Sequence, residues 1–284
     1  RKGQVVHAAA LRIILQLQLG PLHAGHGDVR RRPGCGIDIH ESSPLLPGGN
    51  RRVPIIDDGC RTHEQGIHQV FLLSVCEARE TVLYSALALS GFFPEEELMT
   101  LNQNGTHLPS HCDMNKTIGI DMTTGSLGQG ASTAAGMALG RKMLGKKGNV
   151  FLILGDGELN EGQVWEMAMF AKQHGLDNLI TFVDWNHQQL DGYTEDICNL
   201  GNIETLFKAF GFEAVTINGH DVDAIRTASV NALASKNGLP KCIVLDTVKG
   251  KGWSVTEGKT GIHHIAITDE MMSEAEKEFA GKEL

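Results

Sequence analysis

The residues with the clearest chemical potential lie in "GDGELNEGQVWE", directly after the apolar run "VFLIL". Asp156 stands between Gly155 and Gly157, so a carboxylate occupies a place where the backbone can turn tightly and leave its amides open. Amides at a strand-to-helix turn suit a phosphate, but a neighbouring carboxylate repels that phosphate unless a cation lies between them. Asp156 therefore suggests Mg²⁺ or Ca²⁺, which prefer oxygen ligands.

A second set of oxygen ligands follows the next apolar run, "NLITFVDWN". Asn186 offers an amide oxygen at the corresponding end of a neighbouring strand, and the backbone carbonyl of Gln188 could supply another ligand. Taken alone, the GDG stretch is equally consistent with a simple turn in which Asp156 caps a helix. The Asn at the next strand end favours the interpretation as a metal and diphosphate site.

The elements that must position these residues become regular from Glu80 onward. Apolar runs alternate along the chain with segments of helical periodicity. Within each run the residues are apolar throughout and do not switch between apolar and polar, which predicts a parallel sheet covered on both faces. We therefore expect a doubly wound, mostly parallel α/β fold with ligands beyond the carboxyl ends of its strands. Strands are expected at 149–156, 178–186, 212–219 and 241–248. Helices are expected at 80–91, 126–145, 161–175, 203–211, 221–235 and 268–281.

Composition narrows the classes of function. The chain has 284 residues and a net charge of -9, which argues against a general nucleic-acid or anionic-membrane surface. No apolar run reaches the roughly 18 residues that a membrane span requires. The six cysteines are scattered without a CxxC pair, so zinc or a disulfide framework is not expected and a reducing cytoplasm is the default location.

The spacing of these motifs resembles the thiamine-diphosphate motif, in which GDG is followed after 27 residues by an Asn-containing pair. The pair is usually Asn-Asn, and here it is Trp185-Asn186, so the metal-binding second Asn is kept and Trp185 is the departure. "GDGELNEGQVWE", "GIDMTTGSLGQGASTAAGMALG" and "TVKGKG" followed by "HH" resemble the transketolase family specifically. The resemblance covers about residues 80 to 270.

The resemblance implies a cofactor site of several parts. The Mg²⁺ ligands would be Asp156, Asn186 and the Gln188 carbonyl, and the Gly157 amide would bind the diphosphate. The thiazolium and pyrimidine rings would be lined by Gly125, Ser126 and Leu127, in the turn "TGSLGQG". A close-packed helix start is the simpler explanation for this glycine-rich turn, and the two explanations are compatible.

The resemblance also implies groups that act on the substrate. His111 matches a histidine that contacts substrate, although the family's Gly-His-Pro is Ser-His-Cys here. Lys249 and His263 match a lysine beside the cofactor and a histidine beside substrate and diphosphate. Glu161 resembles an acid that reaches across a dimer toward the partner's cofactor. The simpler explanations are an exposed loop histidine, a surface lysine and a first-turn glutamate favoured by the helix dipole.

Together these matches imply a transketolase, which transfers a two-carbon ketol unit from a ketose phosphate to an aldose phosphate through thiamine diphosphate. The family's pyrimidine-binding domain, with the glutamate that activates the cofactor, has no counterpart in the sequence. We therefore expect the N-terminal subunit of a split transketolase, which assembles as a dimer of subunit pairs and needs a C-terminal partner subunit. Another ketol transferase of the deoxyxylulose-phosphate synthase type is an alternative, but "GELNEGQVWEM" fits transketolase better.

Residues 1–79 differ in amino-acid composition from residues 80–284. The first of these segments holds nine Arg and one Lys, against two Arg and thirteen Lys afterwards. "HAGHGDVRRRP" begins like the family's Gly-His-x-Gly-Gly motif and then departs, and "VFLLSVCEARE" lacks the Lys-Gly-His of a second motif. A one-base shift of possible codons for Arg-Arg-Arg-Pro reads Gly-Gly-Asp-Leu, so we hypothesise that residues from about Asp28 to Arg79 are out of frame.

The alternative is a divergent N-terminal segment in which His26 stands in for the first motif's histidine. If the segment is as written, two substrate-handling histidines are absent. An inactive cofactor-binding subunit or a degenerate gene product then becomes the competing interpretation. The coding DNA decides between these hypotheses.

Overall fold

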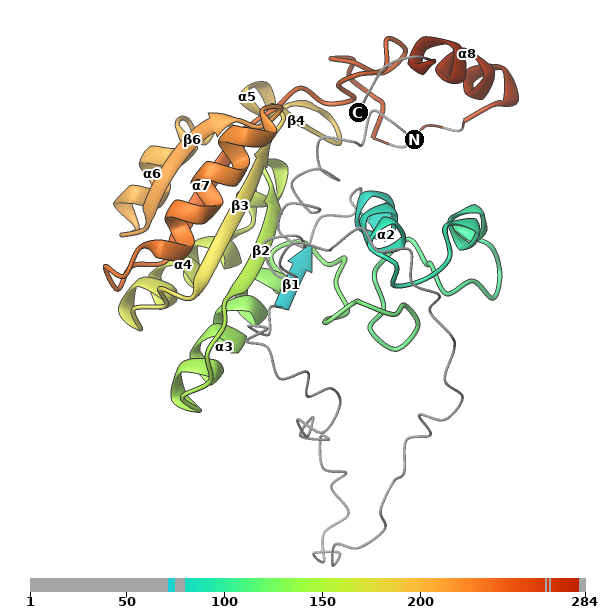
Figure 1. The fold of residues 1–284 in the computed structure, drawn as a ribbon. Helices are drawn as coiled ribbons and strands as arrows, with labels where there is room; N and C mark the ends of the chain where they lie inside the picture. The colour runs from blue at the N-terminus through green and yellow to red at the C-terminus, as the bar shows by residue number, and fades with distance from the viewer. Residues whose placement is uncertain (1–70, 75–79, 264, 266, 281–284) are drawn as a thin grey trace, which may run out of the picture. The chain divides into compact units, whose positions relative to one another are not determined.

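The computed structural model describes residues 71–74, 80–263, 265 and 267–280 (Figure 1). His26 and most of the segment predicted to be out of frame lie outside the described residues. The strands are β1 (Phe71–Ser74), β2 (Val150–Gly155), β3 (Leu179–Trp185), β4 (Gln188–Gln189), β5 (Gly192–Tyr193), β6 (Glu213–Asn218) and β7 (Lys241–Asp246). The helices are α2 (Glu80–Leu89), α3 (Gln129–Met143), α4 (Gly162–Gln173), α5 (Thr194–Ile197), α6 (Ile203–Ala209), α7 (Val222–Ala234) and α8 (Asp269–Phe279), with short 3₁₀ turns η1 (Glu95–Thr100) and η2 (Gly157–Asn160).

Five strands form one sheet in the order β1-β2-β3-β7-β6. Every neighbouring pair in this sheet is parallel. The strands alternate along the chain with α3, α4, α6 and α7, as expected for a doubly wound fold, because parallel strands need crossover connections. The predicted fold class is confirmed.

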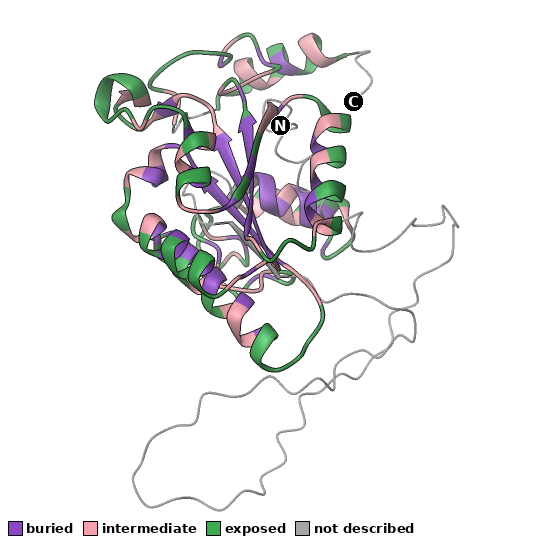
Figure 2. Cartoon of the chain, turned by 90° about the vertical axis from the view of Figure 1, so that its left-hand side faces the viewer, coloured by how far each residue is buried: buried purple, intermediate pink, exposed green. Residues whose placement is uncertain are grey.

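Helices lie on both faces of the sheet, whose central strands are buried (Figure 2). The strand residues alternate between two hydrophobic cores. On one face, residues such as Leu152 and Val183 pack with α3, α4 and α6. On the other face, residues such as Phe151 and Phe182 pack with α2 and α7. The central strands β2, β3 and β7 are therefore buried on both sides, which explains why their sequences lack a polar alternation.

The expectation that all strands are apolar throughout is wrong for β6. Glu213, Val215 and Asn218 are exposed on this strand, whereas Ala214 is buried. The reason is position, because among the strands that the structure describes β6 lies at the edge of the sheet and pairs with β7 alone. An edge strand has less of its surface covered than a central one.

The carboxyl ends of the central strands meet at one edge of the sheet, as the sequence predicted for the site. Gly155 of β2 pairs with Asp184 of β3, and Trp185 of β3 pairs with Asp246 of β7. The loops that follow these strands carry the residues expected to bind ligands. The small β4–β5 hairpin and α5, which follow β3, are absent from the sequence-based expectations.

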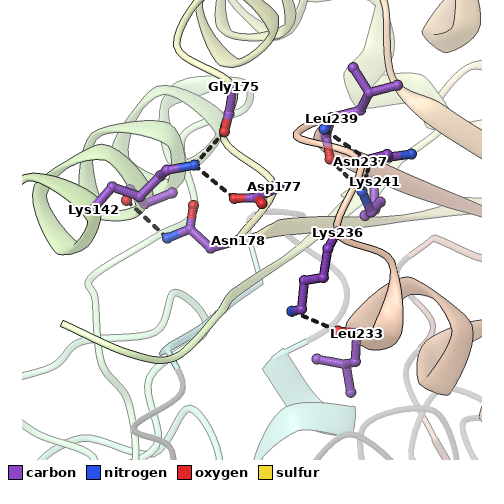
Figure 3. A network of polar contacts seen from close by, with 10 residues as sticks. Lys142, Gly175, Asp177, Asn178, Leu233, Lys236, Asn237, Leu239 and Lys241 are labelled. Carbon is purple, nitrogen blue, oxygen red and sulfur yellow. Dashed lines mark hydrogen bonds and ion pairs between the residues drawn. The ribbon is translucent and has the colours of Figure 1, made fainter. Parts of the chain in front are cut away.

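At the opposite edge of the sheet, where the strands begin, lysine side chains donate hydrogen bonds to loop carbonyls (Figure 3). Lys142 Nζ donates to the Gly175 carbonyl at 2.6 Å and to Asp177 at 2.7 Å, which joins the end of α3 to the loop before β3. Lys241 is only 1% exposed and donates to Asn237 and to the Leu239 carbonyl. These contacts hold the loops at this edge in place, whereas the residues predicted to bind ligands lie at the carboxyl edge.

No helix within the described residues combines the length and the apolar character that crossing a bilayer requires.

Candidate functional site

A cavity of about 580 Å³ lies at the carboxyl edge of the sheet. Its lining comes from the end of β3, the β4–β5 hairpin, the loop that leads to α6, and the loop after β7. Four residues predicted for the site share this cavity: Asp156, Asn186, Gln188 and Lys249. Trp185, the departure from the usual Asn-Asn pair, also lines it, and its ring centroid lies 4.5 Å from that of His187.

Asp156 follows β2 directly and is only 4% exposed. Its Oδ1 accepts a hydrogen bond from the Gly157 amide at 2.9 Å, so the carboxylate caps the 3₁₀ turn η2. A Cβ on Gly157 would lie 2.8 Å from the Cβ of Gln189, which shows how closely the hairpin approaches this backbone. The capping role and the predicted metal role thus fall on the same carboxylate.

Asn186 is held from both ends of its amide. Its Nδ2 donates to Oδ2 of Asp184 at 3.1 Å, and its Oδ1 accepts from the Gln188 amide at 3.0 Å. Asp184 is itself buried and accepts a hydrogen bond from the Thr247 hydroxyl. These bonds orient the Asn186 oxygen, which retains acceptor capacity for a second partner.

The role of Asp184 was missed by the sequence reasoning. The available signal was an acidic residue inside the apolar strand "NLITFVDWN", where a buried carboxylate requires partners. Its partners come from Asn186, two residues on, and from Thr247, which follows β7. The second of these partners is adjacent only because β7 pairs with β3.

Lys249 and His263, both predicted for the site, lie close to each other. Lys249 Nζ is 3.3 Å from Nδ1 of His263, and Lys249 lines the cavity. In the same loop, the backbone amide of Val248 donates to Nε2 of His220 at 2.8 Å. A backbone amide needs a lone pair on its acceptor, so His220 carries its proton on Nδ1 in this arrangement.

The glycine-rich turn before α3 contacts His111. A Cβ on Gly125 would lie 2.7 Å from Cγ of His111, so the imidazole rests against the backbone of the turn. The next two residues, Ser126 and Leu127, are exposed. These residues do not line the cavity, so the structure places the predicted site in two parts.

Glu158 joins these two parts, and its role was also missed by the sequence reasoning. The side chain is 1% exposed. Its Oε1 accepts from the Gly128 amide at 2.9 Å, and its Oε2 accepts from the Gly155 amide at 3.2 Å. Glu161 lies beside the same turn, since a Cβ on Gly128 would be 3.0 Å from its Cβ.

The cavity's donor chemistry fits a hard cation bound to a diphosphate. Within the described residues no cluster of three or more His, Cys, Asp or Glu could hold a metal. The cavity is lined instead by residues with oxygen-bearing side chains, among them the carboxylates of Asp156 and Glu195 and the amides of Asn186 and Gln188. Mixed oxygen ligands of this kind suit Mg²⁺ or Ca²⁺ and leave coordination positions for phosphate oxygens. Lys249 adds positive charge on the side of the cavity nearer β7.

Fold and site together define a parallel α/β domain with an oxygen-rich ligand site at its carboxyl edge. Residues 68–283 match the family described as transketolase, thiamine diphosphate binding domain. The chain belongs to this family. The match begins inside the segment predicted to be out of frame, and that frameshift stays a prediction.

Two relatives are named as transketolase subunits. The 6-deoxy-6-sulfo-D-fructose transketolase subunit SqwG of Clostridium sp. (strain MSTE9) is 52% identical over 202 residues, which cover 70% of this chain and 73% of the relative. An apulose-4-phosphate transketolase subunit of Actinobacillus succinogenes is 39% identical, over 64% of this chain and 65% of the relative. The transketolase of Campylobacter jejuni has a similar structure, with a TM-score of 0.68 and 30% identity over 74% of this chain. The match spans only 34% of that longer chain.

Proposed function

We propose that this chain is the diphosphate- and metal-binding subunit of a thiamine-diphosphate-dependent transketolase. The observation that carries the proposal is the convergence of Asp156, Asn186 and Gln188 on one cavity at the carboxyl edge of the sheet. These are the residues to which the family resemblance assigns the metal. When bound, thiamine diphosphate supplies a nucleophilic carbon that cleaves the bond beside a ketose carbonyl.

The chain's own residues would divide the work between binding and proton handling. Asp156, Asn186 and the Gln188 carbonyl would hold Mg²⁺ or Ca²⁺. The Gly157 amide, which lies beside the Asp156 carboxylate, would bind the diphosphate. Lys249 would balance the diphosphate charge.

Two histidines are placed for substrate contact in this proposal. His111, resting on the turn at Gly125, would donate a hydrogen bond to the sugar, and His263 would act beside Lys249. Imidazoles exchange protons near neutral pH and therefore suit proton transfer to sugar hydroxyls. Glu161, exposed at the start of α4, would meet a second copy of the assembly.

A partner subunit would supply the pyrimidine-binding domain and the glutamate that activates the cofactor. Relatives named as subunits support a split enzyme, and we propose a dimer of subunit pairs. The substrates would be a ketose phosphate as donor and an aldose phosphate as acceptor. The 52% identity to the sulfofructose subunit supports a second candidate donor, a ketose that carries a sulfonate in place of the phosphate.

Calorimetric titration with Mg²⁺ and thiamine diphosphate tests the binding role. We expect saturable binding that Asp156→Asn weakens at least tenfold, and binding that the exposed Asp223→Asn leaves unchanged. Absence of binding by the wild-type chain, with and without its partner subunit, would refute the proposal.

Reconstitution with the partner subunit tests the activity. Ketol transfer from a phosphorylated or sulfonated ketose should appear only when both subunits are present. Appreciable turnover by the isolated chain would contradict the split assignment. Cofactor binding by the reconstituted pair without any transfer would identify an inactive subunit.

A further inference from the structure

Glu158 is a buried carboxylate that the proposed ligand set does not use. It lies in η2, two residues after Asp156, and its two oxygens bind amides from separate parts of the site. One amide belongs to Gly155, the last residue of β2. The other belongs to Gly128, the residue that precedes α3. A single side chain therefore spans the diphosphate end of the site and the turn predicted to line the cofactor's rings.

The diphosphate end has other support. Gly155 is paired with Asp184 in the parallel ladder, and the Asp156 amide donates to the Asp184 carbonyl at 3.1 Å. Because β3 holds this end of β2 through the parallel ladder, loss of the Glu158 contact would leave the end of the strand in place.

The turn before α3 depends more on Glu158. Gly128 is the N-cap residue of α3 and has a left-handed conformation, with φ 77°. As a glycine, it has no side chain that could cap the helix. The first turn of α3 contains no acidic residue. The Glu158 carboxylate accepts from the amide of Gly128 itself and places a negative charge at the positive end of the helix dipole.

We propose that Glu158 is a positioning residue that sets the spacing between the diphosphate end of the cofactor site and the turn Gly125–Leu127. This inference rests on the proposed function, since it concerns the two ends of the same bound cofactor. Glu158 does not touch the reacting atoms in this scheme. It acts through Gly128, whose amide it holds.

Glu158→Gln keeps the shape of the side chain and removes one acceptor. One backbone amide keeps the carbonyl oxygen as its acceptor, and the other faces the new NH₂ group, which is itself a donor. The sheet should keep Gly155 in place, so the loss of the hydrogen bond should shift the turn before α3. Binding of the whole cofactor should weaken by about tenfold, since one lost buried hydrogen bond is worth roughly 1 kcal/mol or more.

Two probes separate this role from general damage. Mg²⁺-thiamine diphosphate reaches both parts of the site, whereas Mg²⁺-pyrophosphate reaches only the diphosphate end. On the full chain, Glu158→Gln should weaken thiamine diphosphate about tenfold and change pyrophosphate affinity less than twofold. Glu166→Gln, an exposed glutamate of α4, is the matched control and should change neither. Equal weakening of both probes, or of neither, overturns the positioning role.

Failure of the proposed function gives a different result, because the wild-type chain would then bind neither probe. Should Glu158→Gln not fold, amide hydrogen exchange on the wild-type chain tests the same claim. The Gly128 amide should exchange slowly, and thiamine diphosphate should slow it further while pyrophosphate should not. Rapid exchange at Gly128, or equal protection by both ligands, overturns the inference.

Discussion

Replacement of Gly125 by alanine tests the geometry of the turn beside His111 most directly. Gly125 is buried, with φ 130°, a region that residues with a Cβ avoid. Holding alanine there costs about 1–3 kcal/mol. The added Cβ would also lie 2.7 Å from Cγ of His111 and 2.9 Å from Nδ1, against about 3.5 Å for ordinary contact. The exposed imidazole must therefore withdraw by roughly 1 Å.

Gly136 provides the matched control, because it lies in α3 with helical φ and nothing within 4 Å of an added Cβ. Gly136→Ala should stabilise the chain by about 0.5–1 kcal/mol, since alanine loses less entropy in a helix. Urea unfolding followed by circular dichroism measures both changes. For a domain of about 200 residues, Gly125→Ala should lower Tm by roughly 2–10 °C.

The two substitutions must change the stability of the chain in opposite directions. Unchanged stability in Gly125→Ala would mean that the turn does not hold the backbone conformation described here. Destabilisation by Gly136→Ala would mean that the outer side of α3 is not open. Histidine NMR signals provide a second measurement, in which Gly125→Ala should shift the His111 resonance and Gly136→Ala should not.

Three further changes test other parts of the molecule. Asp184→Asn should weaken Mg²⁺-thiamine diphosphate binding about tenfold in calorimetry, because Asn186 loses the acceptor that orients it. Phe207→Ala should cost about 3–5 kcal/mol in urea unfolding, since this fully buried ring packs against two other aromatic rings. A hydrogen bond from Lys208 is the largest cause that holds the pKa of Glu204 below its ordinary 4.5. The resulting stabilisation is present above that pH and is lost as pH falls through the lower, folded pKa. Glu204→Gln should therefore lower Tm at neutral pH, with a deficit that shrinks in acid.

The fold was predictable because its local signals agree with its tertiary arrangement. The apolar run "VFLILG" forms β2 and is buried on both faces. The helical periodicity of the segment that forms α4 predicts an end at Gly175, and the helix ends close to that residue. The prediction failed for β6, whose place at the sheet edge depends on strand order. It also overlooked the β4–β5 hairpin, whose strands are only two residues long and carry no periodicity.

The candidate site was predictable to the extent that its residues follow strand ends. Asp156 and Asn186 come directly after apolar strands, and parallel strands bring their carboxyl ends to one edge. Lys249 follows β7 in the same way and shares the cavity with them. The contact between His111 and Gly125 involves a loop and a turn, and only the family resemblance pointed to these two residues.

By itself, the sequence determined the parallel α/β class, the position of the candidate oxygen ligands at strand ends and the transketolase resemblance, because these depend on order along the chain. The tertiary structure decided how those ligands are supported. Asp184 reaches Thr247 because β7 pairs with β3, and Glu158 reaches Gly128 across 30 residues. A buried carboxylate must find its donors in space, and no spacing along the chain reveals which backbone amides the fold will bring to it.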